Sequence, residues 1–224
     1  MYRERPSTIP GAVVWCAEHD GPVRVLPDGC MDLLWLDAQL VVAGPDRIAH
    51  VHDGAGPERV LGLRFSPGRL PAALGVPARS LRDARVPLVD LVDRAAHWAP
   101  AVRPDIDPVA APDPLAAFER QLASTAAART SGQGLVEAIA ASTSVADVAA
   151  STGYSSRQLH RRCLDSFGYG PSVLRRILRF VAAIEDHRCG HPATWVAARH
   201  GYADASHLHR DVRELAGVPL GQLR

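Results

Sequence analysis

The chain has no long apolar run, no lysine and no paired cysteines. No apolar stretch among its 224 residues approaches the roughly 20 residues that a membrane-spanning helix needs. The first ten residues, MYRERPSTIP, lack the apolar core of a signal peptide, so we expect a cytoplasmic protein without a membrane partner. The four cysteines, Cys16, Cys30, Cys163 and Cys189, are widely spaced and fit no CxxC pattern. That spacing favours reduced thiols over disulfides or a zinc knuckle.

Motifs of common enzyme classes are also missing from the sequence. Neither GxGxxG nor GK[ST] occurs, so the glycine-rich stretches indicate no phosphate-binding loop. No Ser/His/Asp set stands in the context of an activated nucleophile. We therefore expect a protein that binds rather than catalyses, with no catalytic residues and no cofactor.

Charge is distributed unevenly along the chain. Because lysine is absent, all 25 basic residues are arginines, against 24 acidic residues. Residues 131–224 hold 11 arginines and 8 acidic residues (+3), whereas residues 1–130 hold 14 and 16 (−2). Six of the ten histidines also lie in the C-terminal part. A mildly basic C-terminal part joined to a mildly acidic N-terminal part is typical of a DNA-binding domain fused to a sensor domain.

Residues 11–66 are expected to form short strands with tight turns between them. Apolar runs alternate with Asp-Gly and Gly-Pro pairs, which are strong turn signals. The expected strands cover Val13–Cys16, Val23–Leu26, Met31–Leu36, Leu40–Ala43 and Val60–Phe65. Several short strands at this spacing predict a small barrel or sandwich.

The middle of the chain changes to helical patterns and then to proline. Arg69–Leu74 predicts a short helix and Pro87–Trp98 a clearer one, with proline at its first position. The stretch 99–114 holds five prolines and no periodicity, which predicts a linker or an extended arm. Leu115–Arg129 is rich in alanine and is expected to be helical.

From residue 135 onward the pattern is helical throughout. Ser144 is the expected N-cap of a helix over Val145–Thr152, with Asp147 in the capping-box position and Gly153 as the left-handed end. The other expected helices are Leu135–Ala141, one from Ser155 or Ser156 to Phe167, a long one opened by Pro171, Ala193–His200 and Ala205–Ala216.

The most informative feature is an internal repeat. VADVAASTGYSSRQLHRR (145–162) and TWVAARHGYADASHLHRD (194–211) share an Ala-Ala pair and a following Gly-Tyr pair, offset by 48 residues. Alanine lets two helices cross closely, glycine supplies the positive φ of the turn, and the aromatic ring fills the corner. Leu159 and Leu208 then anchor the second helix of each copy and leave its opposite face free. Each copy predicts a helix-turn-helix motif.

The free face of each second helix carries hydrogen-bond donors. The first helix offers Arg157, Gln158, His160, Arg161 and Arg162, and the second offers Ser206, His207, His209 and Arg210. Arginine can bind guanine through two hydrogen bonds, and His, Ser and Gln can reach base edges or phosphates. One such copy would indicate only a corner in a helical bundle. Two copies, each followed by a polar, basic helix, favour DNA binding.

These residues resemble the AraC/XylS family of transcription regulators, whose DNA-binding domain joins two such motifs through a central helix. The resemblance covers about residues 135–224, and GYADASHLHR (201–210) is close to the signature of the family's second motif. It implies DNA contacts by Ser156, Arg157, His160 and Arg161 in the first motif and by Ala205, Ser206, His209 and Arg210 in the second. Cys163 and Val212 stand where the family usually has Phe, so the core is expected to be smaller at these positions. Pro219 comes one residue earlier than in the family pattern, so the end of the second motif is expected to pack differently.

The N-terminal part resembles, more loosely, the short cupin-like sensor regions of some of these regulators. The resemblance rests on LPDGCMDLLW (26–35), AGP (43–45) and GLRFSPG (62–68). It implies effector binding or dimerisation. We therefore expect an α+β protein with a β-rich domain over 1–98, a linker and connecting helix over 99–130, and a double helix-turn-helix domain over 131–224. Its expected partner is double-stranded DNA, with a small-molecule effector, RNA polymerase and a second copy of the chain as further candidates.

Several N-terminal residues are of types that could carry other chemistry. Cys16, His19, Cys30, His50 and His52 could gather around a metal ion, but their spacing is that of no known knuckle, so we expect no metal site. Asp28 is expected to serve the Asp-Gly turn. Asp32 interrupts an apolar run and is expected to pair with Arg64, as a structural ion pair or as part of a ligand pocket, and we favour the structural role.

Two alternatives remain open from the sequence. In one, a DNA-binding protein carries a methyl-accepting or metal-sensing N-terminal domain built around cysteine, although only Cys16 and Cys30 are available for it. In the other, the same helices form an interaction module that does not bind DNA.

Overall fold

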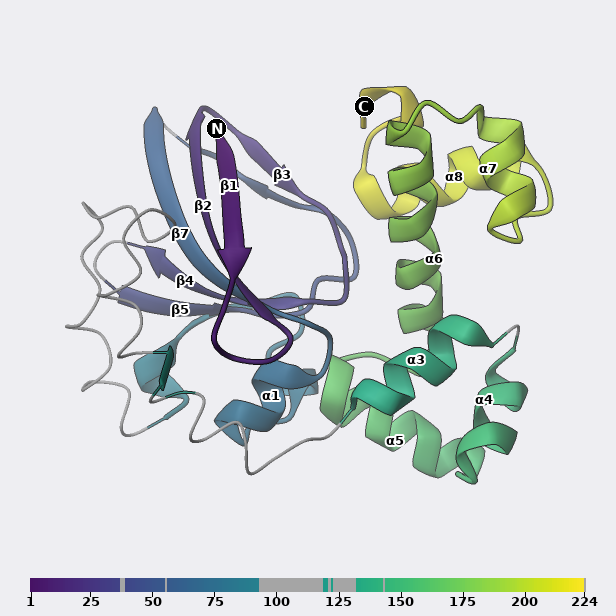
Figure 1. Ribbon diagram of the computed structural model, residues 1–224, viewed down its shortest axis with the longest axis horizontal. Helices are drawn as coiled ribbons and strands as arrows, with labels where there is room; N and C mark the ends of the chain where they lie inside the picture. The colour runs from purple at the N-terminus through teal and green to yellow at the C-terminus, as the bar shows by residue number, and fades with distance from the viewer. Residues whose placement is uncertain are drawn as a thin grey trace.

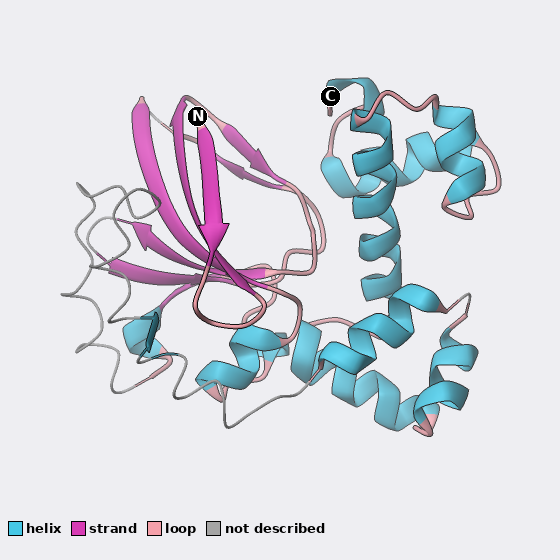
Figure 2. Cartoon of the chain, viewed as in Figure 1, coloured by secondary structure: helices cyan, strands magenta, loops and turns pink. Residues whose placement is uncertain are grey.

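A computed structural model describes residues 1–36, 39–54, 56–92, 119, 120, 122, 132–142 and 144–223. A β-rich N-terminal half lies beside a helical C-terminal half, as the sequence predicts (Figures 1 and 2). In the views shown, the helix α6 (Pro171–Arg188) runs along the side of the strands and connects the helices below it to those above.

The strands form two antiparallel sheets. The larger has the order β1-β2-β7-β4-β5-β8, and the smaller pairs β3 with β6. Their bounds are β1 Tyr2–Pro6, β2 Ala12–Asp20, β3 Val23–Val25, β4 Met31–Leu36, β5 Gln39–Ala43, β6 His50–His52, β7 Pro57–Phe65 and β8 Arg85–Pro87. The five expected strands are therefore present, each within a few residues of its expected ends.

Alternation along the strands gives the larger sheet two different faces. On β4, Met31, Leu33 and Trp35 are buried in the apolar core, which also packs against the short helix α1 (Arg69–Leu74). Asp32 and Leu34 point to the other face and are only half-buried. That face lines a cavity, whose far wall is supplied by β3 and β6.

The helical half contains α3 (Gln133–Ala141), α4 (Val145–Thr152), α5 (Ser156–Phe167), α6, α7 (Ala193–Arg199) and α8 (Ala205–Ala216). The expected helices of this region are confirmed, several of them to the residue. Ser144 caps α4 by accepting a hydrogen bond from the backbone of Asp147 at 3.1 Å, and Gly153 ends it with φ 69°. Ser155 caps α5, which settles the choice between Ser155 and Ser156.

Two apolar clusters lie along α6, one for each helix-turn-helix motif. Leu174 and Ile177, near its start, pack with Leu159 of α5. Phe180 and Ile184, farther along, pack with α7 and α8. Because one continuous helix takes part in both cores, it fixes the two motifs relative to each other.

The expected helix over Pro87–Trp98 is wrong at its start. Arg85–Pro87 is instead strand β8, which pairs with β5, and a single 3-10 turn follows at Leu88–Asp90. Pairing with residues 42 to 46 positions earlier in the chain outweighs the local preference of proline for a helix start. Residues 93–98 lie outside the described residues. So does the proline-rich stretch 99–114.

Residues 119, 120 and 122 are helical, and the rest of the expected Leu115–Arg129 helix is outside the described residues. Glu119 is buried against the N-terminal half, where it accepts hydrogen bonds from the Ser7 hydroxyl and from the backbone of Thr8. Leu122 joins the apolar core of the sheet. This short segment therefore packs with the N-terminal half.

The N-terminal half contacts the far ends of both α5 and α8. Arg79 forms an ion pair with Asp165 near the end of α5. Arg24 donates to the carbonyl of Ala216, the last residue of α8, at 3.0 Å. Leu26 packs against the apolar cluster of the second motif. These contacts leave the first turns of both helices uncovered.

Candidate nucleic-acid interface and the N-terminal cavity

The first candidate reading helix, meaning a recognition helix whose side chains would contact DNA bases, is α5. Its start is fixed by a reciprocal capping box between Ser155 and Gln158, and its apolar side is anchored by the fully buried Leu159. All the expected DNA-contacting side chains of this helix are exposed: Ser156, Arg157, His160, Arg161 and Arg162. The sequence pattern therefore placed the buried and exposed sides of α5 correctly.

The second candidate reading helix, α8, is built in the same way. Asp204 caps it by accepting a hydrogen bond from the backbone of His207 at 2.7 Å, and Leu208 is fully buried. Ser206, His209 and Arg210 are exposed, whereas Ala205 is half-buried. Three polar side chains thus face outward from the first two turns.

Contacts within the protein distinguish some of these side chains from others. The ring of His207 is half-buried and accepts a hydrogen bond from the backbone of Ala203 at 3.2 Å, so it helps to close the N-terminus of α8. Arg162 lies over the ring of Tyr154, 4.6 Å from its centroid. Arg161 and Arg210 project without such a stacking contact among the described residues.

A buried carboxylate fixes α8 onto α6. Asp211 accepts hydrogen bonds from Arg176 Nε at 2.5 Å, from Arg179 at 3.3 Å and from the hydroxyl of Tyr202 at 2.9 Å. Tyr202 is the aromatic residue in the turn of the second helix-turn-helix motif. Its burial and the neighbouring Asp211 carboxylate raise the pKa of its hydroxyl above the usual range. No sequence motif singles out Asp211, which follows the outward-pointing Arg210.

The departures from the family pattern are accommodated by packing. Cys163 and Val212 are both fully buried, so smaller side chains fill these core positions. The C-terminal tail forms a 3-10 turn over Leu220–Gln222, and its Leu220 and Leu223 are buried in the second motif. Arg188 of α6 also donates to the carbonyl of Leu223 at 2.8 Å. The tail therefore completes the core of the second motif.

The cavity of the N-terminal half has a volume of about 160 Å³. Its wall is apolar along Leu34, Leu36 and Val60, and the ring of Trp15 closes one side. Gly62 makes room for that ring, since a Cβ there would lie 2.3 Å from it. Asp46 and Arg85, joined by two hydrogen bonds of 2.6 and 2.9 Å, form a polar part of the lining.

The expected pair between Asp32 and Arg64 is confirmed and lies in this cavity. Arg64 Nε is 3.3 Å from Asp32, which also accepts a hydrogen bond from the Trp15 indole at 2.7 Å. Burial raises the pKa of Asp32, and the Arg64 charge opposes that rise. Asp28 accepts a hydrogen bond from the backbone of Cys30 at 2.8 Å, which confirms its role in the Asp-Gly turn.

Cys30 is not arranged for nucleophilic chemistry. Burial raises the pKa of the Cys30 thiol well above its usual range, and the Asp28 carboxylate raises it further. An alkyl-accepting cysteine needs the opposite shift, because the thiolate is the nucleophile. The four cysteines are free, and none of them belongs to the cluster of metal-ligand side chains found among the described residues.

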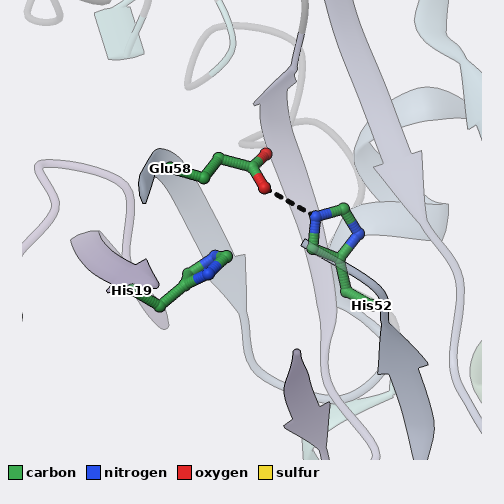
Figure 3. Close-up of side chains that lie close together, drawn as sticks. All are labelled: His19, His52 and Glu58. Carbon is green, nitrogen blue, oxygen red and sulfur yellow. Dashed lines mark hydrogen bonds and ion pairs between the residues drawn. The ribbon is translucent and has the colours of Figure 1, made fainter. Parts of the chain in front are cut away.

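That cluster consists of His19, His52 and Glu58, whose ligand atoms all lie within 4.8 Å of one another (Figure 3). His19 and His52 are among the possible metal ligands that the sequence suggests, whereas Glu58 is not. The strand register would have revealed Glu58, because His19 and Glu58 are directly paired across β2 and β7.

None of the described helices is long and apolar enough to cross a membrane.

Comparison with known structures gives the same two-part fold. ToxT from Vibrio cholerae matches with a TM-score of 0.52 and 12% identity over 95% of this chain and 98% of that chain. ToxT bound to (E)-4-(8-methylnaphthalen-1-yl)but-3-enoic acid matches with 0.51 and 11% over 96% and 100%, and ToxT bound to an unsaturated fatty acid with 0.50 and 14% over 97% and 96%. At these identities the likeness shows the fold alone. A comparison with curated proteins finds no match.

Comparison with protein families matches both halves of the chain. Residues 12–87 match a domain of unknown function (DUF6597), which covers the strands from β2 to β8. Residues 137–224 match a helix-turn-helix domain, which covers both motifs, the connecting helix α6 and the tail. The C-terminal part of the chain is therefore similar to this helix-turn-helix domain.

Proposed function

We propose that this protein is a sequence-specific DNA-binding transcription regulator. The observation that carries the proposal is the pair of capped helices α5 and α8, each anchored by one buried leucine and each exposing arginine on the opposite side. Such helices enter the major groove, where arginine reads guanine through two hydrogen bonds. Their neighbours Ser156, Arg157, His160, Ser206 and His209 supply further contacts to bases and phosphates.

The same proposal gives the N-terminal half a sensing role. Its cavity of about 160 Å³ is close in size to cavities that hold a benzene-sized molecule. The similar ToxT structures hold an unsaturated fatty acid and a naphthyl butenoic acid, which are larger. We therefore assign this chain a smaller effector, with an apolar body against Leu34 and Leu36 and a polar group near Arg64. We further propose RNA polymerase and a second copy of the chain as partners of this protein.

Contacts between the halves offer a route from the cavity to DNA. Val25 and Leu26 line the cavity, and Leu26 also packs against the core of the second motif. The preceding Arg24 binds the last turn of α8. A ligand that moves this segment changes the support of a reading helix without touching DNA itself.

Selection from fragmented genomic DNA tests the function directly. The purified full chain is mixed with genomic fragments and excess competitor DNA at two salt concentrations, and the bound fragments are sequenced and footprinted. We expect a few enriched sites, weaker binding at the higher salt, and changed transcription of the adjacent genes when the protein is deleted. Equal recovery of all fragments would reject sequence-specific binding. Normal transcription beside every enriched site would reject the regulatory role.

The sensing role has a separate test. A set of molecules with up to about 12 non-hydrogen atoms is screened for a rise in the melting temperature of the full chain. We expect hits that also change the affinity for an enriched DNA site. The variant Leu34→Trp, which fills the cavity, should lose the hits and keep DNA binding. Hits that persist in that variant bind elsewhere.

A further inference from the structure

We propose that His19, His52 and Glu58 form a binding site for a divalent metal ion of the zinc class at the rim of the N-terminal cavity. The three residues come from three different strands, β2, β6 and β7, and their side chains converge on one point (Figure 3). Two imidazoles and one carboxylate are a ligand set that zinc adopts in proteins, with the fourth position left open. This proposal does not depend on the DNA-binding function.

The spacing of the ligand atoms is compatible with one ion. Bonds of about 2.0–2.2 Å to nitrogen and oxygen place tetrahedral ligand atoms roughly 3.3–3.6 Å apart. His52 Nε2 and Glu58 Oε2 are 2.7 Å apart, and all three ligand atoms lie within 4.8 Å of one another. A bound ion would move His52 Nε2 and Glu58 Oε2 slightly apart and would draw His19 closer to them. Rotation of side chains suffices, because all three are only half-buried.

His19 is already oriented for coordination. Its Nδ1 lies 3.2 Å from the carbonyl of Gly21, so Nδ1 carries the proton and donates it there. The lone pair is then on Nε2, the other ring nitrogen. Metal-binding histidines are commonly held by such a hydrogen bond from the second ring nitrogen, which fixes both the tautomer and the direction of the ring.

The sheet holds the ligands in place. His19 and Glu58 are opposite each other in the pairing of β2 with β7, so their side chains project from the same face. His52 ends β6 and pairs with Val23 of β3. The ring centroids of His19 and His52 are 5.9 Å apart and meet edge to face. Two of the three ligands are thus fixed by backbone register.

An ion at this position would tie the smaller sheet to the larger one. β6 belongs to the two-stranded sheet, whereas β2 and β7 belong to the six-stranded one. His19 and His52 also line the cavity, so the open coordination position can face a ligand inside it. Binding of the ion is therefore expected to stabilise the N-terminal half.

Calorimetric titration of the chelator-treated full chain with zinc chloride tests the site. We expect one ion per chain, and at least tenfold weaker binding in His19→Ala and in His52→Ala. The matched control is His50→Ala. His50 lies on β6, as His52 does, and its imidazole also lines the cavity, but it is not part of the three-residue cluster. This variant should keep the affinity of the unchanged chain.

A second measurement separates loss of binding from loss of folding. Zinc should raise the melting temperature of the unchanged chain and of His50→Ala, and should leave that of Glu58→Gln and His52→Ala nearly unchanged. Cobalt in place of zinc should give the visible absorption of a four-coordinate site. The proposal is overturned if zinc does not bind, if binding survives in the His19→Ala, His52→Ala double variant, or if His50→Ala loses as much affinity as His52→Ala.

Discussion

Arg176 of α6 donates a hydrogen bond of 2.5 Å to Asp211 of α8, one residue beyond the exposed Arg210. The reading helix therefore carries an outward-facing arginine next to the carboxylate that fixes the helix to its support. Asp211 is almost fully buried and has three donors, so its removal would leave Arg179 and Tyr202 without their acceptor. The pair of Arg176 and Asp211 therefore connects the stability of the second motif to the position of the exposed face of α8.

Removing one partner of a buried ion pair costs about 3–5 kcal/mol. The first prediction is that Asp211→Ala destabilises the protein by somewhat less, about 2–4 kcal/mol, because Arg176 is partly exposed. Chemical unfolding measures this change. The control is Glu214→Ala, which removes the more exposed acidic partner of the same arginine and should cost less than about 1 kcal/mol. Equal effects of the two changes would show that burial of Asp211 has no energetic consequence.

The second prediction concerns Arg161 and Arg210. Changing either to Ala should weaken binding to an enriched DNA site by about 1–3 kcal/mol and relax the preference at one base position, while the melting temperature stays the same. Arg47→Ala is the control, because this arginine is exposed on the N-terminal half and pairs there with Asp83. Unchanged affinity in both reading-helix variants would remove these arginines from the interface.

The third prediction uses the cysteines. Burial raises the pKa of Cys163 to about 12 and shifts the pKa of Cys30 upward as well, so both thiols stay protonated at pH 8. Cys189 is exposed. Alkylation of the native chain at pH 8, followed by mass spectrometry, should label Cys189 first and leave Cys30 and Cys163 unlabelled until the protein unfolds. Rapid labelling of Cys30 would revive the methyl-accepting alternative.

The fourth prediction is that a fragment starting near Thr130 folds as a helical unit and binds DNA more weakly than the whole chain. Its two apolar clusters are built almost entirely from residues after 132, with Leu26 as a partner from the N-terminal half. Circular dichroism and a DNA titration measure folding and affinity. An unfolded fragment would mean that both halves share one core, and the proposed division into domains would be wrong.

Local signals explain why the helical half could be predicted in detail. Ser144, Ser155 and Pro171 mark helix starts, and Gly153 marks an end, by interactions that reach only three or four residues. The bounds of α5 and α8 follow from such signals alone. The sequence predicted less of the N-terminal half, because strands β6 and β8 have only three residues each and pair with strands that lie much earlier in the chain.

In the candidate sites, too, local signals could be predicted from the sequence and long-range contacts could not. The exposed side chains of α5 and α8 follow from helical periodicity around Leu159 and Leu208. Glu58 could not be grouped with His19 from the sequence, because their proximity depends on the pairing of β2 with β7. Similarly, the role of His207 in closing the start of α8 depends on the position of its ring rather than on its place in the repeat.

The spacing between two DNA sub-sites shows whether both helices of one chain contact DNA bases. The connecting helix α6 has 18 residues and is about 27 Å long at 1.5 Å per residue. Together with the girth of the packed helices, this length can place α5 and α8 in major grooves about 34 Å apart on one face of DNA. We expect one chain to protect about two helical turns, and an insertion of about 5 base pairs between the sub-sites to reduce the affinity to that of a single motif. Unchanged affinity after the insertion would show that only one of the two helices reads DNA.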